Sequence, residues 1–320
     1  SQIIYANEVP IENINVVAPS EGILLAMSAA LRANDTVVCM SPNYQSLSEI
    51  AKSVVGCKVV DWNVQWCGKT NEPIFLVEDL KELMSSYRVR MVVINSPHNP
   101  TGAALKPHDF EEIVAICRKH GAYLFSDEMY KGLERDPQME LPNACEYERG
   151  ISLNGCSKTL SMPGIRIGWL STNDKKIVER VEELKDFTTI SPSVVSEVYA
   201  SYALRNRCQI IGQNRERIAR CWSIMKTFLE KNEDIFEFYE PAGGTWIFPR
   251  LRGGCHASTF VDSCYQHARV LAIPSKLFGL EEDDRIRLTF GRDETPEFVK
   301  IFDGAMEKIK QDFKRNAVYN

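Results

Sequence analysis

The sequence predicts an α/β fold, in which a mostly parallel sheet is flanked by helices and is followed by a smaller α+β domain. Two observations support this prediction. Over about the first 170 residues, short β-branched runs alternate with stretches of helical composition, as in a parallel sheet covered on both faces. From about residue 176 the pattern becomes mainly helical, and a mixed segment follows residue 231. A chain of 320 residues can form two domains, which we expect at 1–215 and 216–320.

Seven strands are predicted in the first region, from short runs rich in Val, Ile and aromatic residues. They cover 13–17, 36–40, 58–64, 91–95, 122–126, 151–155 and 165–171. Four helices are predicted between the early strands, from helix-forming composition or from apolar residues spaced three and four apart. They cover 21–33, 46–54, 77–87 and 108–120. Gly121 supplies the left-handed residue that is favoured just past the end of the fourth helix.

The second region is predicted to combine helices with short extended segments. The stretch 176–231 is mainly helical in composition. Extended segments are expected within 241–251, 269–274 and 284–290, and a closing helix at 297–313. This mixture predicts the smaller α+β domain.

Composition and charge exclude several classes of protein. Hydrophobic residues make up 44% of the chain and charged residues 25%, as in ordinary soluble proteins. The net charge of −5 gives no support for a nucleic-acid or acidic-membrane partner. No apolar run reaches the roughly 20 residues that span a bilayer, and residues 1–10 lack the pattern of a signal peptide. The ten cysteines include no CxxC pair, so we expect reduced thiols in a cytoplasmic protein and no metal site.

Polar and aromatic residues follow five of the predicted strands. Ligands bind outside the carboxyl ends of the strands in open α/β sheets, so these five loops should meet at one edge. Each loop alone has an ordinary explanation as a turn or a helix cap, and Lys158 alone would most often be a solvated lysine. Together they predict a site. The loops are 18–21, 41–44, 96–102, 127–130 and 156–158.

Four segments resemble the motifs of the class I/II (fold type I) aminotransferases, which depend on pyridoxal 5′-phosphate (PLP). SKTLSMPGIRIGW (157–169) resembles the PLP-lysine signature, and NSPHNPTG (95–102) the Asn-Pro-Thr-Gly loop. SDEMY (126–130) resembles the Asp-x-x-Tyr element, and RIRLTF (285–290) the carboxylate-binding strand. The segments come in the family's order over nearly the whole chain. Others, such as FSDEMYKGLE, look most like the capreomycidine-synthase-like branch.

The resemblance implies roles for the residues around the ring of PLP. Lys158 would form the Schiff base with the cofactor and would then act as a general base. Asp127 would keep the pyridine nitrogen protonated, because a nearby negative charge favours the charged form. Asn99 and Tyr130 would donate hydrogen bonds to the phenolic oxygen, and Tyr44 would stack on the ring.

The resemblance also implies a binding site for the cofactor phosphate. Arg166 offers a guanidinium fork, Ser157 a hydroxyl, and the helix beginning near Ser20 its free amides. Family members commonly have Gly-Ala or Gly-Ser where this chain has Ala18-Pro19. Proline has no N–H, so one donor to the phosphate is expected to be missing and cofactor binding to be looser.

Arg287 is implied as the ligand of the substrate α-carboxylate, with Arg285 as the less favoured choice on the same strand. Asn99 is expected to contact the substrate as well. Trp246, within 243–246, is equally compatible with a pocket-shaping role and with core packing.

The implied function is an aminotransferase that interconverts an α-amino acid and its 2-oxo acid, as a cytoplasmic homodimer. A PLP-dependent lyase, cyclase or oxidase on the same scaffold is the alternative, because the cofactor residues do not fix the reaction type. A non-catalytic relative is disfavoured by the intact set of cofactor residues. A nicotinamide-dependent dehydrogenase is disfavoured because no GxGxxG opens the first helix. Family chains are usually longer, so an N-terminal portion is expected to be absent here.

Overall fold

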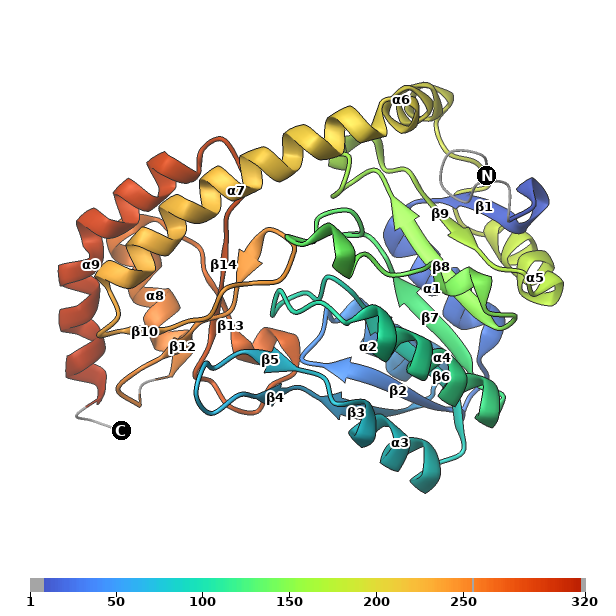
Figure 1. Ribbon diagram of the computed structural model, residues 1–320, viewed down its shortest axis with the longest axis horizontal. Coiled ribbons are helices and arrows are strands. Elements are labelled where there is room, and N and C mark those ends of the chain that lie inside the picture. Colours follow the sequence, from blue (N-terminus) through green and yellow to red (C-terminus); the bar gives the residue numbers. More distant parts are fainter. Residues whose placement is uncertain (1–8, 255, 318–320) are drawn as a thin grey trace.

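A seven-stranded sheet forms the centre of the computed structural model, which describes residues 9–254 and 256–317. The strand order is β1-β9-β8-β7-β6-β2-β3 (Figure 1). The strands are β1 Ile14–Val17, β2 Thr36–Ser41, β3 Lys58–Asn63, β6 Val89–Asn95, β7 Tyr123–Asp127, β8 Gly150–Gly155 and β9 Gly168–Ser171. Neighbours from β8 to β3 pair in parallel, whereas β9 is antiparallel to both β8 and β1. The predicted mostly parallel sheet is therefore confirmed.

Helices cover both faces of this sheet, as the sequence predicted. They are α1 Pro19–Ala30, α2 Ser46–Glu49, α3 Val77–Ser86, α4 Pro107–His120 and α5 Lys175–Lys185. One hydrophobic cluster joins α1 and α5 to the sheet, and a second joins α3 and α4 to the other face. Along β2, Val37 and Cys39 belong to the first cluster, and Val38 and Met40 to the second. This alternation follows from the two-residue repeat of a strand.

Two predicted helices have different limits from those expected. The first begins at Pro19, whose fixed φ suits the first helical turn, and it ends where Leu31 is extended. The segment predicted as one helix at 46–54 is instead one turn of α-helix, α2, followed by the π-helical segment η2 Ile50–Val55. This second segment ends at the left-handed Gly56.

Two predicted extended segments are shorter than expected. The strand predicted at 165–171 begins only at Gly168, because Arg166 adopts a left-handed conformation with φ 57°. Within 269–274 only β13 Ile273–Pro274 is a strand, since Arg269 is left-handed and ends the preceding helix.

The C-terminal part contains the predicted mixture of helices and short strands. Its helices are α6 Val194–Arg205, α7 Arg207–Lys231, α8 Ala257–Ala268 and α9 Thr295–Ala317. The strands β11 Trp246–Ile247, β14 Ile286–Thr289 and β13 form one sheet, and β10 Phe236–Glu237 pairs with β12 Arg250–Leu251. A hairpin of β4 Gln65–Trp66 and β5 Pro73–Ile74 projects from the large sheet. Short 3-10 segments are η1 Ile11–Asn13, η3 Pro137–Met139, η4 Ala144–Glu146, η5 Pro163–Ile165 and η6 Ser275–Phe278.

Helix α7 connects the two parts of the molecule. Figure 1 shows it running from α6 beside the large sheet to α9. The small-domain core consists of buried residues after position 215, together with Met129, Tyr130 and Leu133 from the segment after β7. The division predicted between residues 215 and 216 falls inside this helix and stays a prediction.

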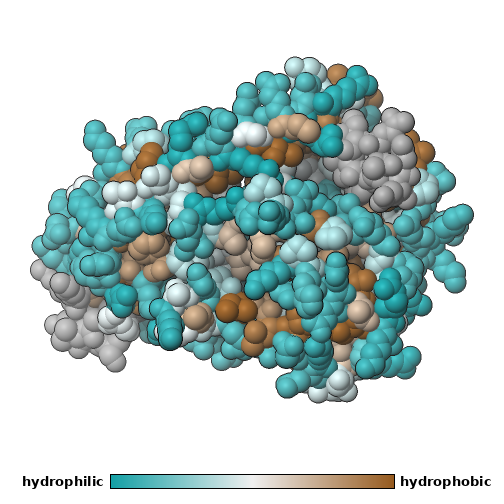
Figure 2. Space-filling model, in the orientation of Figure 1, coloured by the Kyte–Doolittle hydropathy of each residue, from teal (hydrophilic) through white to brown (hydrophobic). Residues whose placement is uncertain are grey.

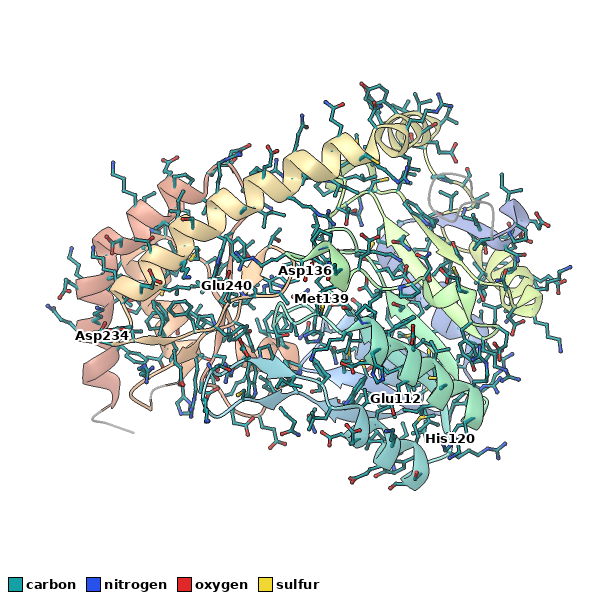
Figure 3. The ribbon with its side chains drawn as sticks, in the orientation of Figure 1. Glu112, His120, Asp136, Met139, Asp234 and Glu240 are labelled. Atoms are coloured by element: carbon teal, nitrogen blue, oxygen red, sulfur yellow. The ribbon has the colours of Figure 1, made fainter. Side chains whose placement is uncertain are left out.

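The segment after β7 lies against the small domain. Figure 3 shows Asp136 and Met139 near Glu240, and Arg135 forms an ion pair with Glu240. Glu134 and Gly243 form a bridge between the same two segments. The loop that follows Asp127 is therefore held by both domains.

The surface seen in Figure 2 is hydrophilic over most of its area, with apolar side chains in separate patches. Within the described residues, no helix combines the length and apolar composition needed to cross a membrane. The same part of the chain contains no cluster of three His, Cys, Asp or Glu side chains placed to hold a metal ion. Its nine cysteines are all unpaired.

Candidate active site

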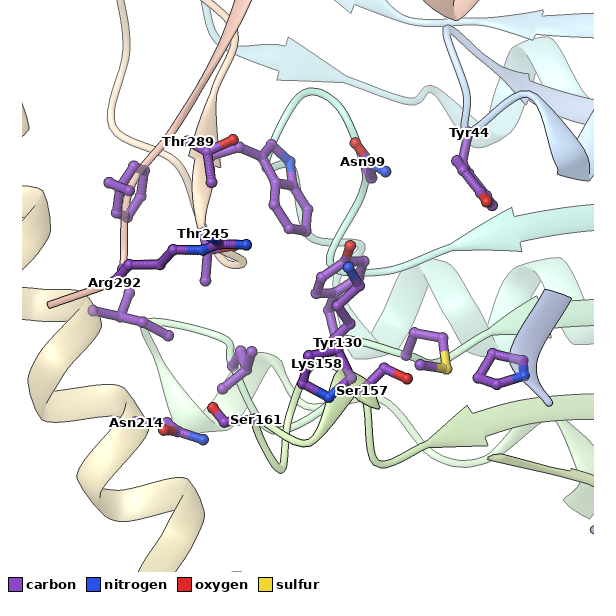
Figure 4. A pocket seen from close by; sticks show the side chains of 18 of the residues that line it. Tyr44, Asn99, Tyr130, Ser157, Lys158, Ser161, Asn214, Thr245, Thr289 and Arg292 are labelled. Carbon is purple, nitrogen blue, oxygen red and sulfur yellow. The ribbon is translucent and has the colours of Figure 1, made fainter. Parts of the chain in front are cut away.

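A cavity of about 790 Å³ opens between the carboxyl ends of the large sheet and the small domain. All ten residues that the sequence predicted for the site line it. They are Pro19, Ser20, Tyr44, Asn99, Asp127, Tyr130, Ser157, Lys158, Arg166 and Arg287. Figure 4 shows several of these side chains converging from separate loops. We call Asn99, Asp127, Tyr130, Ser157 and Lys158 the sheet wall, and Asn214, Arg217, Trp246, Arg287 and Arg292 the small-domain wall.

Strand register brings the sheet wall together. Asn95, the last residue of β6, is level with Asp127, which is level with Leu153 of β8. The side chain of Asn95 ties these ends to the next loop: its Nδ2 donates to the Asp127 carbonyl at 2.9 Å, and its Oδ1 accepts from the Asn99 amide at 2.8 Å. The predicted turn at 96–102 is thus anchored to β7 by one side chain.

Lys158 lies in the turn between β8 and β9, where its carbonyl accepts the Ser161 amide at 3.0 Å. Its Nζ is 5.8 Å from the centre of the Tyr130 ring. Partial burial lowers the pKa of the Lys158 amine, and the positive charges of Arg287 and Arg292 lower it further, against the attraction of Asp127. A lowered pKa increases the neutral fraction of the amine, which is the nucleophilic and basic form.

Asp127 is a buried carboxyl group at the end of β7, with 5% exposure. One oxygen accepts the Met129 amide at 3.1 Å, and the other has no partner among the described residues. Burial raises the pKa of Asp127 to about 7, the Met129 amide opposes this, and Glu128 adds to it. The carboxylate would therefore be stabilised by a cationic group placed beside its second oxygen.

Arg287 joins the two walls. Its Nη1 donates to Asn99 Oδ1 at 2.7 Å, while its Nε is buried without a partner. Because Asn99 accepts through Oδ1, its Nδ2 donor remains available to a ligand. Arg285 does not line the cavity: its guanidinium is buried over Trp66 and donates to Asn71 at 2.6 Å. Of the two arginines considered from the sequence, only Arg287 faces the site.

Tyr130 and Trp246 pack edge to face across the two walls, with ring centres 4.2 Å apart. Burial raises the pKa of the Tyr130 hydroxyl above its usual range, so this group is a hydrogen-bond donor at neutral pH. The indole Nε1 of Trp246 donates to the His98 carbonyl at 3.0 Å. Trp246 both lines the cavity and belongs to the small-domain core. The pocket-lining position and the core packing that the sequence left open therefore occur together.

Donors suited to an anion lie at the other end of the cavity. The Ser157 hydroxyl is buried without a partner. Arg166 donates one guanidinium bond, to the Pro163 carbonyl at 3.1 Å. Pro19 is the first residue of α1, and the Ala18 amide is already bonded to Glu21 Oε2 at 3.0 Å. The start of α1 therefore offers the amides of residues 20 and 21, but none from residue 19.

Close packing holds the start of α1 against β9. A Cβ atom at Gly168 would lie 2.7 Å from the Asn154 carbonyl oxygen and 3.1 Å from the Pro19 ring. Glu21 ties the same turn to the segment after α5, through Thr188 and Thr189. Glu21 was not anticipated from the sequence, although a Glu three residues after a helix start is a known capping signal.

Most of the small-domain wall was also missed. Asn214 and Arg217 are one turn apart on α7, a spacing that places them on one helix face but does not indicate what they face. Arg292 follows β14, five residues after Arg287. All three line the cavity, and Figure 4 shows Asn214 and Arg292 at its small-domain side.

Comparisons with known proteins agree with this geometry. The model of the family "Aminotransferase class I and II" matches residues 7–300. Aromatic-amino-acid aminotransferase 2 of Thermococcus litoralis is 28% identical over 280 residues, 86% of this chain and 70% of the relative. Capreomycidine synthase of Streptomyces vinaceus is also 28% identical, over 85% of this chain and 68% of the relative. These two values do not separate the branches, so the branch stays a prediction.

Solved structures share the fold over nearly the whole chain. A PLP-dependent aminotransferase from Streptococcus suis 89-1591 superposes with a TM-score of 0.86 and 27% identity, covering 98% of this chain and 81% of that one. An aromatic aminotransferase from Pyrococcus horikoshii OT3 gives a TM-score of 0.81 at 26% identity, with coverages of 93% and 80%. With the family model spanning most of the sequence, the chain belongs to the class I and II aminotransferase family.

Proposed function

We propose that this aminotransferase interconverts an α-amino acid and its 2-oxo acid, with PLP bound to Lys158. The observation that carries the proposal is the meeting of Lys158, Asp127 and Arg287 in one cavity. The PLP-dependent aminotransferases are the enzyme class of the family to which the chain belongs.

The residues of the cavity fit PLP. The Ser157 hydroxyl is a buried donor without a partner, and Asp127 has one unpaired carboxylate oxygen. An anionic ligand with a cationic ring nitrogen would satisfy both. When bound, PLP supplies an aldehyde that bonds to amines and a ring that withdraws electrons from the substrate α-carbon.

Two residues act on the substrate in this proposal. Arg287 holds the α-carboxylate through its guanidinium fork, and its bond to Asn99 fixes the orientation of that fork. Lys158 Nζ moves the proton at the substrate α-carbon, a task suited to an amine whose pKa is lowered toward neutrality. Asn99 lies between the substrate and the cofactor positions.

The remaining predicted residues hold the cofactor. Asp127 takes the pyridine nitrogen, Tyr130 and Asn99 the phenolic oxygen, and Tyr44 the ring face. Arg166, Ser157 and the amide of Ser20 take the phosphate, with Pro19 beside it as a position that cannot donate. The partly exposed Tyr44, at 39%, is supported by its place in the cavity lining.

A PLP-dependent lyase or cyclase remains the second candidate, favoured by the similarity to capreomycidine synthase. The two can be separated by incubating the PLP-loaded enzyme with a panel of amino acids, with and without a 2-oxo acid. Transamination predicts a new amino acid only when the 2-oxo acid is present. Ammonia or a cyclised product without the acceptor would contradict it.

A second copy of this chain is the partner we propose, with a cytoplasmic location supported by the unpaired cysteines. One face of α6 and the segment before it are apolar and exposed, with Phe187 at 88%. The opposite face of α6 is buried, through Ala200 and Ala203. The exposed residues are Phe187, Ile190, Val194, Val195, Val198, Tyr199 and Tyr202.

An apolar face of this kind favours association. Sedimentation velocity should give a dimer for the unmodified protein and a monomer for Val198→Asp. A monomer for the unmodified protein would contradict the proposed homodimer.

A further inference from the structure

Arg285 is a buried cation that the proposed chemistry does not use. The residue is 4% exposed, and its guanidinium lies 3.3 Å from the centre of the Trp66 ring. Burial lowers the pKa of Arg285 to about 10, which leaves the group charged at neutral pH. The neighbouring carboxylate of Asp284 is engaged by Arg250 at 2.8 Å, and Arg285 has no ion pair within the described residues. Burying a charge without an ionic partner costs stability, so a role for Arg285 beyond packing has to be considered.

Neutral groups hold the Arg285 guanidinium instead of a carboxylate. Its Nη2 donates to Asn71 Oδ1 at 2.6 Å, and its Nη1 donates to the Phe248 carbonyl at 3.3 Å. Asn71 is itself buried and left-handed, with φ 57°, and its Nδ2 donates to the Glu237 carbonyl at 3.2 Å. The face of Trp66 adds a cation–π contact. The guanidinium is therefore fixed both by its own domain and by two residues of another segment.

That segment, which contains Trp66 and Asn71, is the hairpin of β4 and β5 that projects from the large sheet. Figure 1 shows the hairpin extending from β3 toward the small domain. Gln65 Nε2 donates to Asp79 Oδ2 at 3.2 Å, which ties the hairpin to α3. The Trp66 ring packs against the hydrophobic cluster under α3 and α4 and also against the small-domain core. Arg285 is thus the small-domain side of a contact between the two parts of the molecule.

The same contact lies close to Arg287 along the chain. Arg285 directly precedes β14, and alternate residues of an extended segment point to the same side. Backbone bonds hold this segment within the small domain: the Arg285 carbonyl accepts the Ser275 amide at 2.9 Å, and Arg287 pairs with Ile273 of β13. The Arg285 side chain instead holds the segment against the large-sheet hairpin. Arg287 depends on that placement, because its Nη1 reaches across to Asn99 Oδ1 at 2.7 Å.

We propose that Arg285 is a positioning residue that acts through Arg287. Its contacts with the hairpin hold β14 at the distance from the large sheet at which Arg287 reaches Asn99. The inference rests on the proposed function, since it assumes that Arg287 holds the substrate α-carboxylate. A guanidinium binds a carboxylate through a fork of fixed geometry, so a small displacement of the strand weakens the bond. Arginine suits the positioning role, because its planar group stacks on an indole ring while its edge donates hydrogen bonds.

Two variants of the PLP-loaded enzyme test this role. Arg285→Met keeps a flexible apolar side chain against the indole ring but removes the charge and the donors. Asn71→Gly removes the acceptor and keeps the left-handed conformation, and it serves as the test if Arg285→Met does not fold. Arg252→Met is the matched control, because Arg252 is exposed and does not line the active-site cavity.

Initial rates measure kcat and KM for an amino acid that the unmodified enzyme transaminates. Calorimetry measures the affinities for pentanoate and for pentanamide, which lacks the carboxylate charge. We expect Arg285→Met and Asn71→Gly to raise KM by roughly threefold to thirtyfold, the usual range of coupling between neighbouring groups, with a smaller change in kcat. The preference for pentanoate over pentanamide should fall by a similar factor.

The control and the cofactor spectrum distinguish positioning from general destabilisation. Arg252→Met should leave KM and the pentanoate preference unchanged, and all three variants should keep the absorbance spectrum of the PLP-loaded protein. A merely structural role for Arg285 would lower kcat with the amount of folded, loaded enzyme and would leave KM unchanged. That result, or an unchanged pentanoate preference, would overturn the inference.

A double-mutant cycle shows whether Arg285 acts through Arg287. Arg287→Lys removes the fork on which the effect depends, so adding Arg285→Met to it should raise KM by less than about twofold. A further rise as large as that caused by Arg285→Met alone would mean that the two residues act independently, and would also overturn the inference.

These measurements separate the inference from the proposed function. If pentanoate binding depends on Arg285 and Arg287 together but no amino acid is transaminated, the proposed function fails and the positioning role stands. If transamination occurs with a KM that does not depend on Arg285, only the inference fails.

Discussion

The sheet wall and the small-domain wall face the same cavity but hold their side chains by different means. On the sheet wall, Asp127 ends β7 and the loop that contains Asn99 follows β6, and the register of these paired strands fixes the backbone. On the small-domain wall the strands have two to four residues. The backbone of Arg292 is held by Cys221 and Thr295, and Arg217 donates to the carbonyl of the preceding Gly291. A site anchored by a sheet suits a constant cofactor, whereas a site anchored by individual side chains can change with the substrate.

The sheet wall is also the more buried of the two. Its members are buried except Lys158, whereas Arg217 and Arg287 of the small-domain wall are half-buried and Arg292 is exposed. Because the sheet wall carries the proposed cofactor residues, changes there should abolish the chemistry, and changes in the small-domain wall should alter which substrate is used. The predictions for Lys158 and Arg287 test that division, and those for Asp127 and Pro19 test other residues proposed to contact the cofactor.

Lys158→Ala should have the largest effect, because it removes the group that we propose to bond PLP and to move the α-proton. We expect kcat to fall by about 10⁴-fold or more. Circular dichroism should show an unchanged fold, since the side chain is exposed to the cavity. Lys119→Ala, at an exposed lysine of α4, is the control. A residual rate within tenfold of the unmodified enzyme would contradict the claim that the sheet wall carries the chemistry.

The raised pKa of Asp127 predicts that the stability of the PLP-free protein depends on pH. Burial raises its pKa from 3.8 to about 7, so over this window the folded chain keeps a proton that the unfolded chain has lost. This contribution to the free energy of unfolding is complete below pH 3.8 and is lost as the pH rises through 7. At about 1.4 kcal/mol per pKa unit, its upper bound is roughly 4 kcal/mol.

Urea unfolding at pH 5 and pH 8 measures this loss. The unmodified PLP-free protein should lose more stability between the two values than Asp127→Asn, which cannot ionise at this position. Bound PLP should reduce the difference, because its ring nitrogen is a cationic partner for the carboxylate. Equal losses in the two proteins would mean that Asp127 does not titrate between these pH values.

Arg287→Lys should act mainly on substrate binding. The lysine keeps the charge but loses the fork that can hold a carboxylate and Asn99 together. Initial rates should show KM for the amino acid raised by about tenfold to a hundredfold, with a smaller change in kcat. A fall in kcat at constant KM would instead place Arg287 with the sheet wall.

Pro19→Ala should have the smallest effect and should be favourable. It restores one backbone N–H at the first residue of α1, beside the proposed phosphate position. We expect the dissociation constant for PLP to fall by roughly threefold to tenfold, as one added hydrogen bond to a charged group allows. Fluorescence titration of the PLP-free protein checks this. Weaker binding would show that Pro19 contributes more by stabilising the start of α1 than an added backbone N–H contributes by binding the phosphate.

The sheet wall could be predicted from the sequence, because two signals agreed. The alternation of strands and helices placed the loops at one edge, and the motifs around Asn99, Asp127 and Lys158 resembled a known family. The strand before Asn99 begins two residues earlier than predicted, at Val89, and β9 begins three residues later, because the left-handed Arg166 intervenes.

The small-domain wall could not be predicted to the same depth. Strands of two residues, such as β11, are too short to show an alternating pattern. Asn214 and Arg217 face the cavity because of where α7 packs in the tertiary structure, and the local sequence does not show this. The direction of Arg292 depends on the positive φ of Gly291 and on bonds from α7, neither of which leaves a mark on local composition.

The central claim is that Lys158 holds PLP. The most direct measurement is borohydride reduction of the PLP-loaded protein, followed by proteolysis and mass spectrometry of the peptides. The account predicts loss of the cofactor absorbance band and a reduced pyridoxyl adduct on the peptide that contains Lys158. The absence of an adduct, or an adduct on another lysine while Lys158 is unmodified, would contradict it.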